Sequence, residues 1–258
     1  MQAFGHERET WVTDEQLMEA VRDGDVYVVN GSKTFITSGC RADQVTCAVR
    51  TGEEGAHGIS FLVIEKGTPG FSTSNKLRKM GWWASDTAEL FFDDCRVPVV
   101  NRIGEENQGF YIIMENFQAE RLSLAIMANM TAQLALEEAL RYAREREAFG
   151  KPLTGFQVTR HKLAELATLV EISREYTYRV AARMDAGIDQ IKEVSMAKNF
   201  ACSVSNRVTY EAVQIFGGNG YSKEYPVERH FRDAKITEIY EGTSEAQRMV
   251  ISSLELKK

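Results

Sequence analysis

The spacing of hydrophobic residues changes near residue 100, and this change predicts two parts of different kinds. Before it, short apolar runs alternate with polar positions and are separated by glycine and proline. Such alternation is typical of antiparallel strands that bury one face. After it, apolar residues recur every three or four positions in stretches rich in Ala, Leu, Glu and Arg, which favours amphipathic helices.

The first part of the chain is predicted to form a series of short strands. Asp23-Gly24 is a turn signal, and Asn30-Gly31 is the residue pair most typical of a two-residue hairpin loop. The sequence therefore predicts a hairpin centred on Asn30-Gly31. Further strands are expected at residues 45–49, 59–64 and 88–92, and together they predict a small antiparallel barrel or sandwich.

Long helices are predicted in the second part of the chain. Residues 107–147 are expected to form one or two of them, and residues 156–185 and 189–216 carry apolar stripes at helical spacing. The run Gly217-Gly218-Asn219-Gly220 is expected to end the third of these stretches. Thr243 or Ser244 is placed to cap a last helix.

The predicted fold class is α+β, with a small antiparallel β-barrel or sandwich followed by an antiparallel four-helix bundle. The predicted ranges are an atypical N-terminal segment at 1–20, a β-barrel middle domain at 21–100 and a C-terminal helical bundle at 101–258. With 258 residues and 43% hydrophobic side chains, the chain can bury the cores of both domains.

Composition narrows the classes of function. The net charge of -6 gives no electrostatic reason to expect nucleic acid as a partner. No apolar stretch approaches the ~20 residues that a helix needs to span a bilayer, and no secretory signal is visible. The 4 cysteines and 4 histidines are scattered without the spacing of metal ligands. We therefore expect free thiols, a cytoplasmic location and no metal site.

Two local features are candidates for binding, and each has a plainer interpretation. The glycine run at 217–220 could be mistaken for a phosphate loop, but a helix rather than a strand precedes it, so it is most simply a helix end. A basic cluster surrounds the break at Gly150-Lys151-Pro152, and it is either a solvated helix end or a site for a pyrophosphate. Its members are Arg144, Arg146, Lys151, Arg160 and Lys162.

Glu241 is the candidate for acid–base chemistry. It follows two apolar residues and precedes Gly242-Thr243. In that position it is either an ordinary surface carboxylate or, in a dry pocket, a general base with a raised pKa. The residues alone leave both interpretations open.

Seven segments of the chain carry a further signal when they are taken in order. They are Tyr27–Thr37, Lys79–Pro98, Arg146–Leu153, Phe156-Gln157, Gln214–Gly220, Tyr225–Lys235 and Glu241–Arg248. In their order and spacing they resemble the middle and C-terminal domains of the acyl-CoA dehydrogenase family, and the resemblance covers nearly the whole chain from about Val21 onward.

The resemblance implies an FAD-dependent oxidoreductase, a flavoprotein of fatty acid and lipid metabolism. Family members oxidise an acyl-CoA to the trans-2-enoyl-CoA: a carboxylate removes the α-proton, and the β-hydrogen leaves as hydride to the flavin. The electrons then pass to an electron-transfer flavoprotein. The family is typically a homodimer or a homotetramer, so the same is expected of this chain.

By position, the resemblance gives Glu241 the role of the base. Its own backbone N–H would help to hold the thioester oxygen of the substrate. Glu120, Arg121 and Gly242 would contact the substrate. Glu120 also occupies the position where long-chain and isovaleryl-type members carry their base, so it is the alternative to Glu241.

Contacts with FAD are implied at positions that match the family's motifs. Phe35 and Thr37 would lie against the flavin ring, Ile36 between them is a further implied FAD contact, and Phe35 stands where many relatives carry Trp. The other implied contacts, several of them across a subunit interface, are Arg146, Phe149, Gln157, Gln214, Gly217, Gly218, Thr243 and Glu245.

The beginning of the sequence departs from the family's pattern. Family members start with a helical domain of roughly a hundred residues, and residues 1–20 match neither that domain nor the segment that usually precedes the first flavin-facing strand. We therefore expect a truncated or shifted product, one part of a split enzyme, or a flavin-free, non-catalytic assembly module. An acyl-CoA oxidase, which passes its electrons to oxygen, is the remaining alternative.

Overall fold

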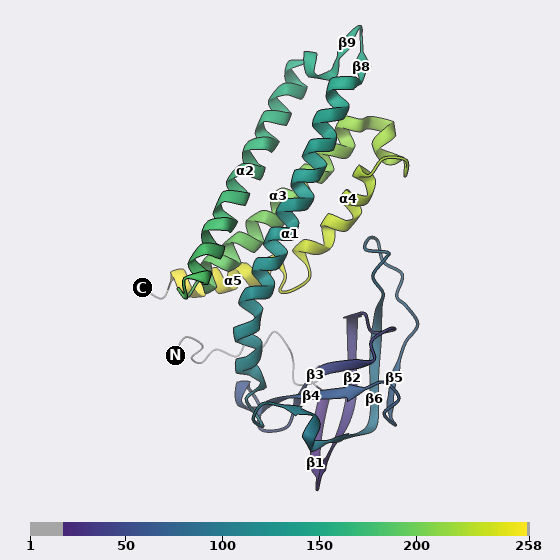
Figure 1. Cartoon of the computed structure of the whole chain (residues 1–258), viewed down its shortest axis with the longest axis vertical. Helices are drawn as coiled ribbons and strands as arrows, with labels where there is room; N and C mark the ends of the chain where they lie inside the picture. Colours follow the sequence, from purple (N-terminus) through teal and green to yellow (C-terminus); the bar gives the residue numbers. More distant parts are fainter. Residues whose placement is uncertain (1–17, 257–258) are drawn as a thin grey trace. The chain divides into compact units, whose positions relative to one another are not determined.

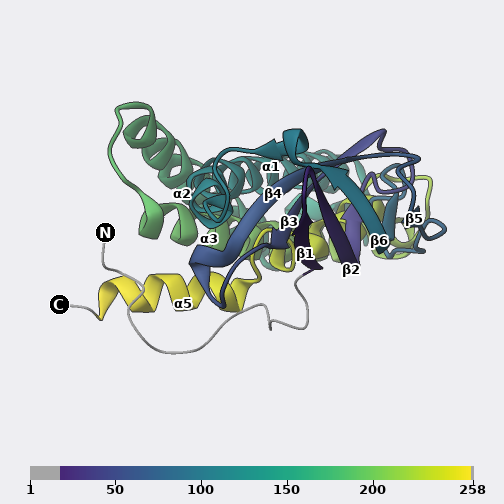
Figure 2. The ribbon, with the colours of Figure 1, turned by 90° about the horizontal axis from the view of Figure 1, so that it is seen from below.

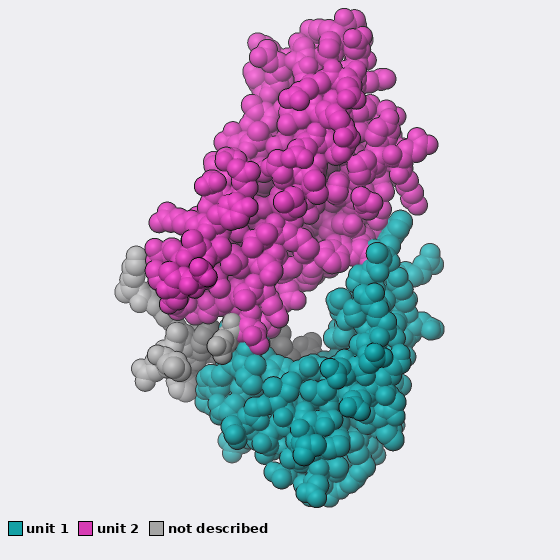
Figure 3. Space-filling view, in the orientation of Figure 1, with its two compact units in different colours: residues 1–79, 83–114 teal, residues 80–82, 115–258 magenta. Residues whose placement is uncertain are grey.

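The computed structural model describes residues 18–256, which divide into two compact units (Figure 3). The first unit contains the residues up to Lys79 together with Trp83–Met114, and the second contains Met80–Trp82 and the residues from Glu115 onward. Of the predicted segment 1–20, residues 1–17 lie outside the described residues, and residues 18–20 belong to the first strand. The predicted domain ranges 21–100 and 101–258 stay a prediction.

The first unit contains one open, mixed sheet (Figure 1) with the strand order β5-β6-β2-β1-β3-β4-β7. All neighbours pair antiparallel except β1 and β3, which are parallel. The strands are β1 Met18–Asp23, β2 Val26–Thr37, β3 Gln44–Arg50, β4 Ile59–Glu65, β5 Phe71–Thr73, β6 Thr87–Pro98 and β7 Arg102–Ile103. Since the edge strands β5 and β7 do not pair with each other in the described part of the chain, the sheet does not close, and the predicted barrel is wrong in that respect.

Alternation along the strands separates the core of this unit from its surface. β3 and β4 alternate buried and less buried residues over most of their length. Tyr27, Val29, Val49 and Leu62 are among the fully buried side chains that pack together on one face of the sheet. This pattern is the one that predicts half-buried strands from the sequence.

The predicted hairpin at Asn30-Gly31 is wrong, because β2 runs through these residues without a turn. The turn lies at Gly24-Asp25 instead, where Asp23 pairs with Val26 and Gly24 has a φ of 61°. Asn30 lies at a bulge opposite β6. Its Nδ2 donates to Oδ1 of Asp94 at 3.1 Å, and its Oδ1 accepts from the Asp94 backbone N–H at 2.7 Å. The Asn-Gly pair therefore serves a bulge rather than a turn.

Three long antiparallel helices form most of the second unit (Figure 1). They are α1 Gly109–Glu145, which begins in the first unit, α2 Gln157–Asp185 and α3 Ile191–Phe216. The hairpin of β8 Glu147–Ala148 and β9 Lys151–Pro152 joins α1 to α2. The predicted helices are thus present, and 107–147 forms one helix rather than two. The α+β class is confirmed.

Two shorter helices complete the unit. α5 Ser244–Glu255 lies across the long helices and is seen lengthwise in Figure 2. The other is α4 Val227–Ala234, which was not predicted from the sequence. Short 3-10 helices connect the elements of both units: η2 Ala56–Gly58, η3 Val99–Asn101, η4 Leu153–Gly155, η5 Gly217–Tyr221 and η6 Lys235–Glu238.

A row of alanines forms the buried face of α1. Its members, all 0% exposed, are Ala125, Ala128, Ala132, Ala135, Ala139 and Ala143. They pack against buried residues of α2 and α3, including Val180 toward one end and Leu166 and Val208 toward the other. Because the distance between packed helices depends on the side chains at the contact, a row of small residues brings the helices close together. Larger side chains at these positions would not fit without moving the helices apart.

Candidate functional site

The predicted base lies in a short loop between η6 and α5. Glu241 has a φ of 51° and Gly242 a φ of 88°, so both lie in the left-handed region, which a glutamate rarely adopts. Thr243 then caps α5, because its Oγ1 accepts from the Ala246 backbone N–H at 3.2 Å. A strained residue of this kind persists only where its surroundings hold it, and such residues cluster at functional sites.

Two buried polar side chains hold the loop. Lys198 of α3 is 0% exposed, and its Nζ donates to the backbone oxygens of Tyr240 at 3.1 Å and Gly242 at 2.7 Å. Gln247 of α5 is also 0% exposed, and its Nε2 donates to the backbone oxygens of Glu241 at 3.4 Å and Gly242 at 3.3 Å. Side chains therefore bind three consecutive backbone carbonyls around the predicted base.

Charged residues of α1 act on the Glu241 carboxyl. The pKa of Glu241 is raised, first because the carboxyl is partly buried and then because the nearby Glu120 carboxyl repels its charge and shares a hydrogen bond with it. Lys198 and Arg121 oppose the rise, and burial lowers the pKa of each of them. Glu241 is still open to solvent. A reachable carboxyl with a raised pKa is a stronger base than an ordinary glutamate.

Three buried polar atoms around the loop have no hydrogen-bond partner among the described residues. They are Nε of Arg121, the hydroxyl of Tyr240 and Oε1 of Gln247. The Arg121 guanidinium lies 5.4 Å from the centroid of the Phe117 ring, and Trp82 meets the Tyr240 ring edge-on at 6.0 Å. Because an unsatisfied buried polar group costs free energy, this cluster is suited to a ligand that supplies the missing partners.

The backbone N–H of Glu241 is another unused donor. It makes no hydrogen bond to any acceptor within residues 18–256. The loop therefore presents a carboxyl and an amide donor from the same residue, as proton abstraction next to a carbonyl requires.

A second group of predicted residues lies at the other end of the long helices. There the Tyr142 ring of α1 stacks on Phe216 of α3 at 3.9 Å, and the Leu153 backbone N–H donates to the Arg146 oxygen at 2.9 Å. Asn219 Nδ2 donates to the Tyr142 hydroxyl at 2.9 Å. These contacts bring the end of α1, the end of α3 and the segment before α2 together, and the predicted residues Arg146, Gln157 and Gln214 lie at this end of the helices.

The side chains at this end are turned outward. Arg146, Gln157 and Gln214 are exposed and make no side-chain hydrogen bond within the described residues. Phe149 is 97% exposed and has a φ of 49°. Nothing lies within 4 Å of a Cβ built on Gly217 or Gly218. Exposed donors, an exposed aromatic ring and open glycines together fit a large polar ligand with an apolar part.

The two predicted groups are far apart in one chain. Glu120 lies in the first third of α1 and Arg146 directly follows its last residue, so a rise of 1.5 Å per residue separates them by about 40 Å. A small ligand bound beside Glu120 therefore cannot also contact Arg146 of the same chain.

The remaining predicted residues belong to the first unit and to the surface of α5. Phe35 is 76% exposed with a φ of 61°, at a second bulge of β2, while Ile36 packs against the core and Thr37 ends the strand. Glu245 lies in the first turn of α5 and accepts from Arg248 at 3.1 Å. The bulge explains how an aromatic ring on a strand comes to point into solvent.

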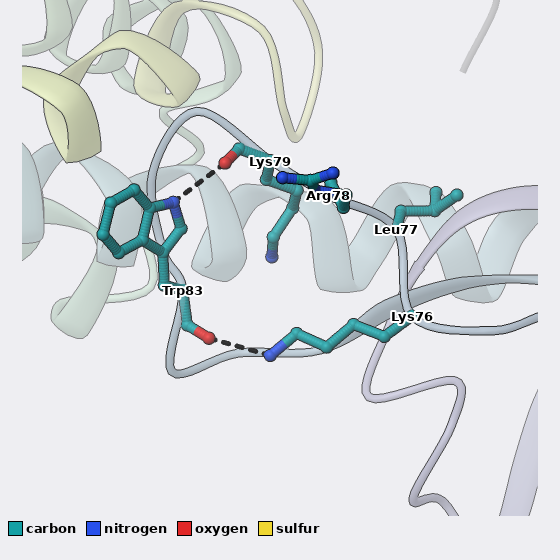
Figure 4. A pocket seen from close by; sticks show the side chains of 5 residues that line it. All are labelled: Lys76, Leu77, Arg78, Lys79 and Trp83. Carbon is teal, nitrogen blue, oxygen red and sulfur yellow. Dashed lines mark hydrogen bonds between the residues drawn. The ribbon is translucent and has the colours of Figure 1, made fainter.

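A hollow of about 360 Å³ in the first unit contains none of the predicted residues (Figure 4). Two of its cations are used within their own loop. Lys76 Nζ donates to the Trp83 oxygen at 2.8 Å, and Lys79 Nζ donates to the Ser85 oxygen at 2.9 Å. The hollow is lined by Lys76, Leu77, Arg78, Lys79 and Trp83.

The structure thus brings Glu120, Arg121, Gly242 and Thr243 to Glu241, and it keeps the Arg146 end apart from them. The roles of these residues stay predictions. Sequence reasoning missed Lys198 and Gln247 as parts of the site. A signal was present for Lys198, since it is a lysine on the apolar face of α3 that carries Val194, Ala197 and Ala201.

Two further observations bear on the class of protein. Nowhere in residues 18–256 does a helix combine the length and apolar character needed to cross a membrane. The cysteines are free thiols, as predicted, and Cys47, Cys95 and Cys202 are buried. Burial raises the pKa of Cys47 to about 11, so this thiol is unreactive at neutral pH.

Comparisons with known proteins connect this architecture to a family. The chain is 46% identical over 234 residues to an acyl-CoA dehydrogenase of Bacillus subtilis, covering 90% of this chain and 62% of that protein. It is 41% identical over 240 residues to the CarC subunit of the caffeyl-CoA reductase–Etf complex of Acetobacterium woodii, covering 93% and 63%. The chain therefore spans less than two thirds of the length of these relatives.

A solved structure and two family profiles agree with these relatives. Butyryl-CoA dehydrogenase from Megasphaera elsdenii superposes with a TM-score of 0.89 at 45% identity, covering 94% of this chain and 64% of that one. The profile for the acyl-CoA dehydrogenase middle domain matches residues 12–95, and the profile for the C-terminal domain matches residues 107–254. Since these matches take in most of its length, the chain belongs to the acyl-CoA dehydrogenase family.

Proposed function

We propose that this chain carries the catalytic base and part of the flavin site of an FAD-dependent acyl-CoA dehydrogenase, which converts an acyl-CoA to its trans-2-enoyl-CoA. The observation that carries the proposal is the Glu241 loop. It presents a solvent-reachable carboxyl with a raised pKa beside an unused backbone N–H. Family membership and the names of the relatives support the same reaction.

Glu241 would remove the α-proton of the bound thioester. Its raised pKa makes the carboxylate a stronger base than an ordinary glutamate, and the neighbouring Glu120 contributes to that rise. The Glu241 backbone N–H would donate to the thioester oxygen, where negative charge develops as the proton leaves. Arg121 and Lys198 are the two cations that act on the carboxyl and oppose the rise in its pKa.

Residues at three places fit FAD. Exposed Phe35 offers an apolar ring on the first unit, exposed Phe149 and Arg146 offer a ring and a cation, and Gly217-Gly218 leaves open space for close approach. Arg146, Gln157 and Gln214 would bind the polar parts of the cofactor. When bound, FAD supplies the acceptor for the β-hydride.

The separation within α1 favours an oligomer. Because Glu120 and Arg146 of one chain lie about 40 Å apart along the helix, a cofactor that contacts both kinds of end would bridge two copies. A homodimer or homotetramer in which the Arg146 end of one copy meets the Glu241 end of another satisfies this requirement.

An electron-transfer flavoprotein is the proposed electron acceptor. The relative from Acetobacterium woodii is a subunit of a complex with Etf, and it is 41% identical to this chain. The proposed location is the cytoplasm, in keeping with the free cysteines.

One experiment tests the reaction and the base together. The purified full chain is incubated with FAD, and flavin reduction is followed anaerobically across a panel of acyl-CoA thioesters. We expect reduction by the unmodified chain and a loss of about 10³-fold in Glu241→Gln, because the general base is gone while flavin binding is kept. Glu120→Gln is the matched control and should lose far less.

Each other outcome has a defined meaning. A complete loss in Glu120→Gln with activity kept in Glu241→Gln would move the base to Glu120. Protein that stays colourless after incubation with FAD would contradict the proposal and favour a flavin-free assembly module. Peroxide formed in air without an acceptor protein would indicate an oxidase.

A further inference from the structure

We propose that Lys198 is a positioning residue that fixes the direction of the Glu241 backbone N–H and carboxyl through the two peptide carbonyls on either side of Glu241. The inference deepens the proposed function, on which its catalytic meaning rests. The effect of Lys198 on the order of the loop and on the Glu241 carboxyl can be measured without any catalysis.

Peptide geometry links the lysine to the amide donor. Lys198 Nζ binds the Tyr240 oxygen at 3.1 Å, and that oxygen belongs to the same peptide unit as the Glu241 N–H. The peptide is trans, as are all those described. In a trans peptide the C=O and N–H bonds point in opposite directions. Holding the Tyr240 oxygen on Lys198 therefore aims the Glu241 N–H away from α3, where it has no acceptor within residues 18–256.

The second contact closes the loop on its other side. Lys198 Nζ binds the Gly242 oxygen at 2.7 Å, so one ammonium group spans the residues on both sides of Glu241. A hydrogen bond from an ammonium group is stronger than one between neutral groups. Two such bonds offset the unfavourable left-handed φ of 51° at Glu241.

Packing alone does not account for a lysine at this position. The residue is 0% exposed and forms its hydrogen bonds with carbonyls, and a buried ammonium costs free energy unless it is compensated. A methionine would fill a similar volume without that cost. The groups whose charges act on Lys198 are Arg121 from α1, Cys202 from α3, and Glu238 and Glu241 from the segment before α5. Its charge therefore acts on Glu241.

Nuclear magnetic resonance of the full chain, without FAD or substrate, tests the proposal with two variants. Lys198→Met removes the donors and the charge, while Lys198→Gln keeps amide donors on a somewhat shorter side chain and removes the charge. Lys192→Met is the control, because Lys192 lies on the same helix and pairs with Glu255 at the surface at 2.9 Å. The measurements are backbone order parameters for residues 240–243 and the titration of the ¹³C-labelled Glu241 carboxyl.

The expected results separate positioning from general stability. In Lys198→Met the order parameters of residues 240–243 should fall from about 0.85 to below about 0.6, with the rest of α3 and α5 unchanged. The Glu241 titration should move to higher pH in both Lys198 variants and stay in place in Lys192→Met, because a neighbouring cation is lost. In Lys198→Gln the loop should remain more ordered than in Lys198→Met.

Other results would overturn the proposal. An unchanged loop and an unchanged Glu241 titration in Lys198→Met would mean that the lysine does not position the base. If neither variant folds, the unmodified protein decides: order parameters near 0.85 across 240–243 support a tethered loop, and values below about 0.6 refute it. Failure of flavin reduction would refute the proposed function but would leave these measurements as they are.

Discussion

The two ends of the long helices differ in how their polar groups are satisfied. At the Glu241 end, buried Lys198 and Gln247 bind the backbone oxygens of the loop, so the protein itself holds the segment that carries the proposed base. At the other end, Arg146 and Phe149 point into solvent without such support. If the proposed function holds, the comparison indicates that the proposed base is preorganised within one chain, whereas the proposed FAD contacts are completed by groups from a second copy.

The largest expected contrast between the ends is in stability. Gly242→Ala should lower the free energy of unfolding by about 3 kcal/mol, because the φ of 88° is strained for alanine and its Cβ would lie 2.4 Å from Gln247 Nε2. Gly218→Ala, at the other end, meets nothing within 4 Å and should change it little. Urea unfolding measures both. Equal losses in the two variants would contradict the idea that only the Glu241 end is tightly held.

A smaller contrast is expected in cofactor affinity. Arg146→Ala should weaken FAD binding by about tenfold, the loss expected for one charge-assisted hydrogen bond, without changing the Glu241 titration. Arg141→Ala is the control, because Arg141 lies in the last turns of α1, close to Arg146 in sequence, and its guanidinium is paired with Glu138. Fluorescence titration with FAD measures the affinity. If Arg141→Ala weakens binding as much as Arg146→Ala, the end has no specific flavin contact at Arg146.

The smallest expected effect is a pH dependence of stability confined to the Glu241 end. A carboxyl whose folded pKa is raised contributes stability that is fully present below its unfolded pKa of about 4.5 and is lost as the pH rises through the folded value. Glu241→Gln should therefore be more stable than the unmodified chain at pH 7 to 8. The difference should shrink towards pH 4. Thermal unfolding across this range measures it, and a difference that grows on acidification would contradict the raised pKa.

Local patterns were enough to predict the long helices and most of the longer strands, but not the short strands β5, β7, β8 and β9, the helix α4 or all of the connections. The long helices follow from apolar spacing, because burial of one face repeats every few residues. The prediction of a hairpin at Asn30-Gly31 was wrong for a physical reason. The pair has a strong local preference for a turn, but Asn30 bonds to Asp94, which lies 64 residues away in the chain. Such a partner cannot be seen in a window of a few residues.

In the candidate site, too, the sequence predicted the residues of one continuous segment and missed those that reach it from elsewhere in the chain. Glu241 and Thr243 belong to a continuous segment that matches the family's motif, so both were predicted together. Lys198 reaches the loop from 42 to 44 residues away and Gln247 was only part of a matching segment, so neither was assigned a contact. Burial of Lys198 on an apolar face depends on how α3 packs, which the spacing of its neighbours indicates only in part.

The alanine-lined helix α1 has a consequence for the size of the proposed oligomer. It is a single helix of 37 residues, so the distance between Glu120 and Arg146 is set by residue count alone. Lengthening it by one turn would move one end by about 5.4 Å. In a symmetric assembly of the proposed kind, both cofactor positions would be displaced at once. The number of residues in α1 would therefore set a dimension of the proposed oligomer, and insertions there should be far less tolerated than insertions in the loops.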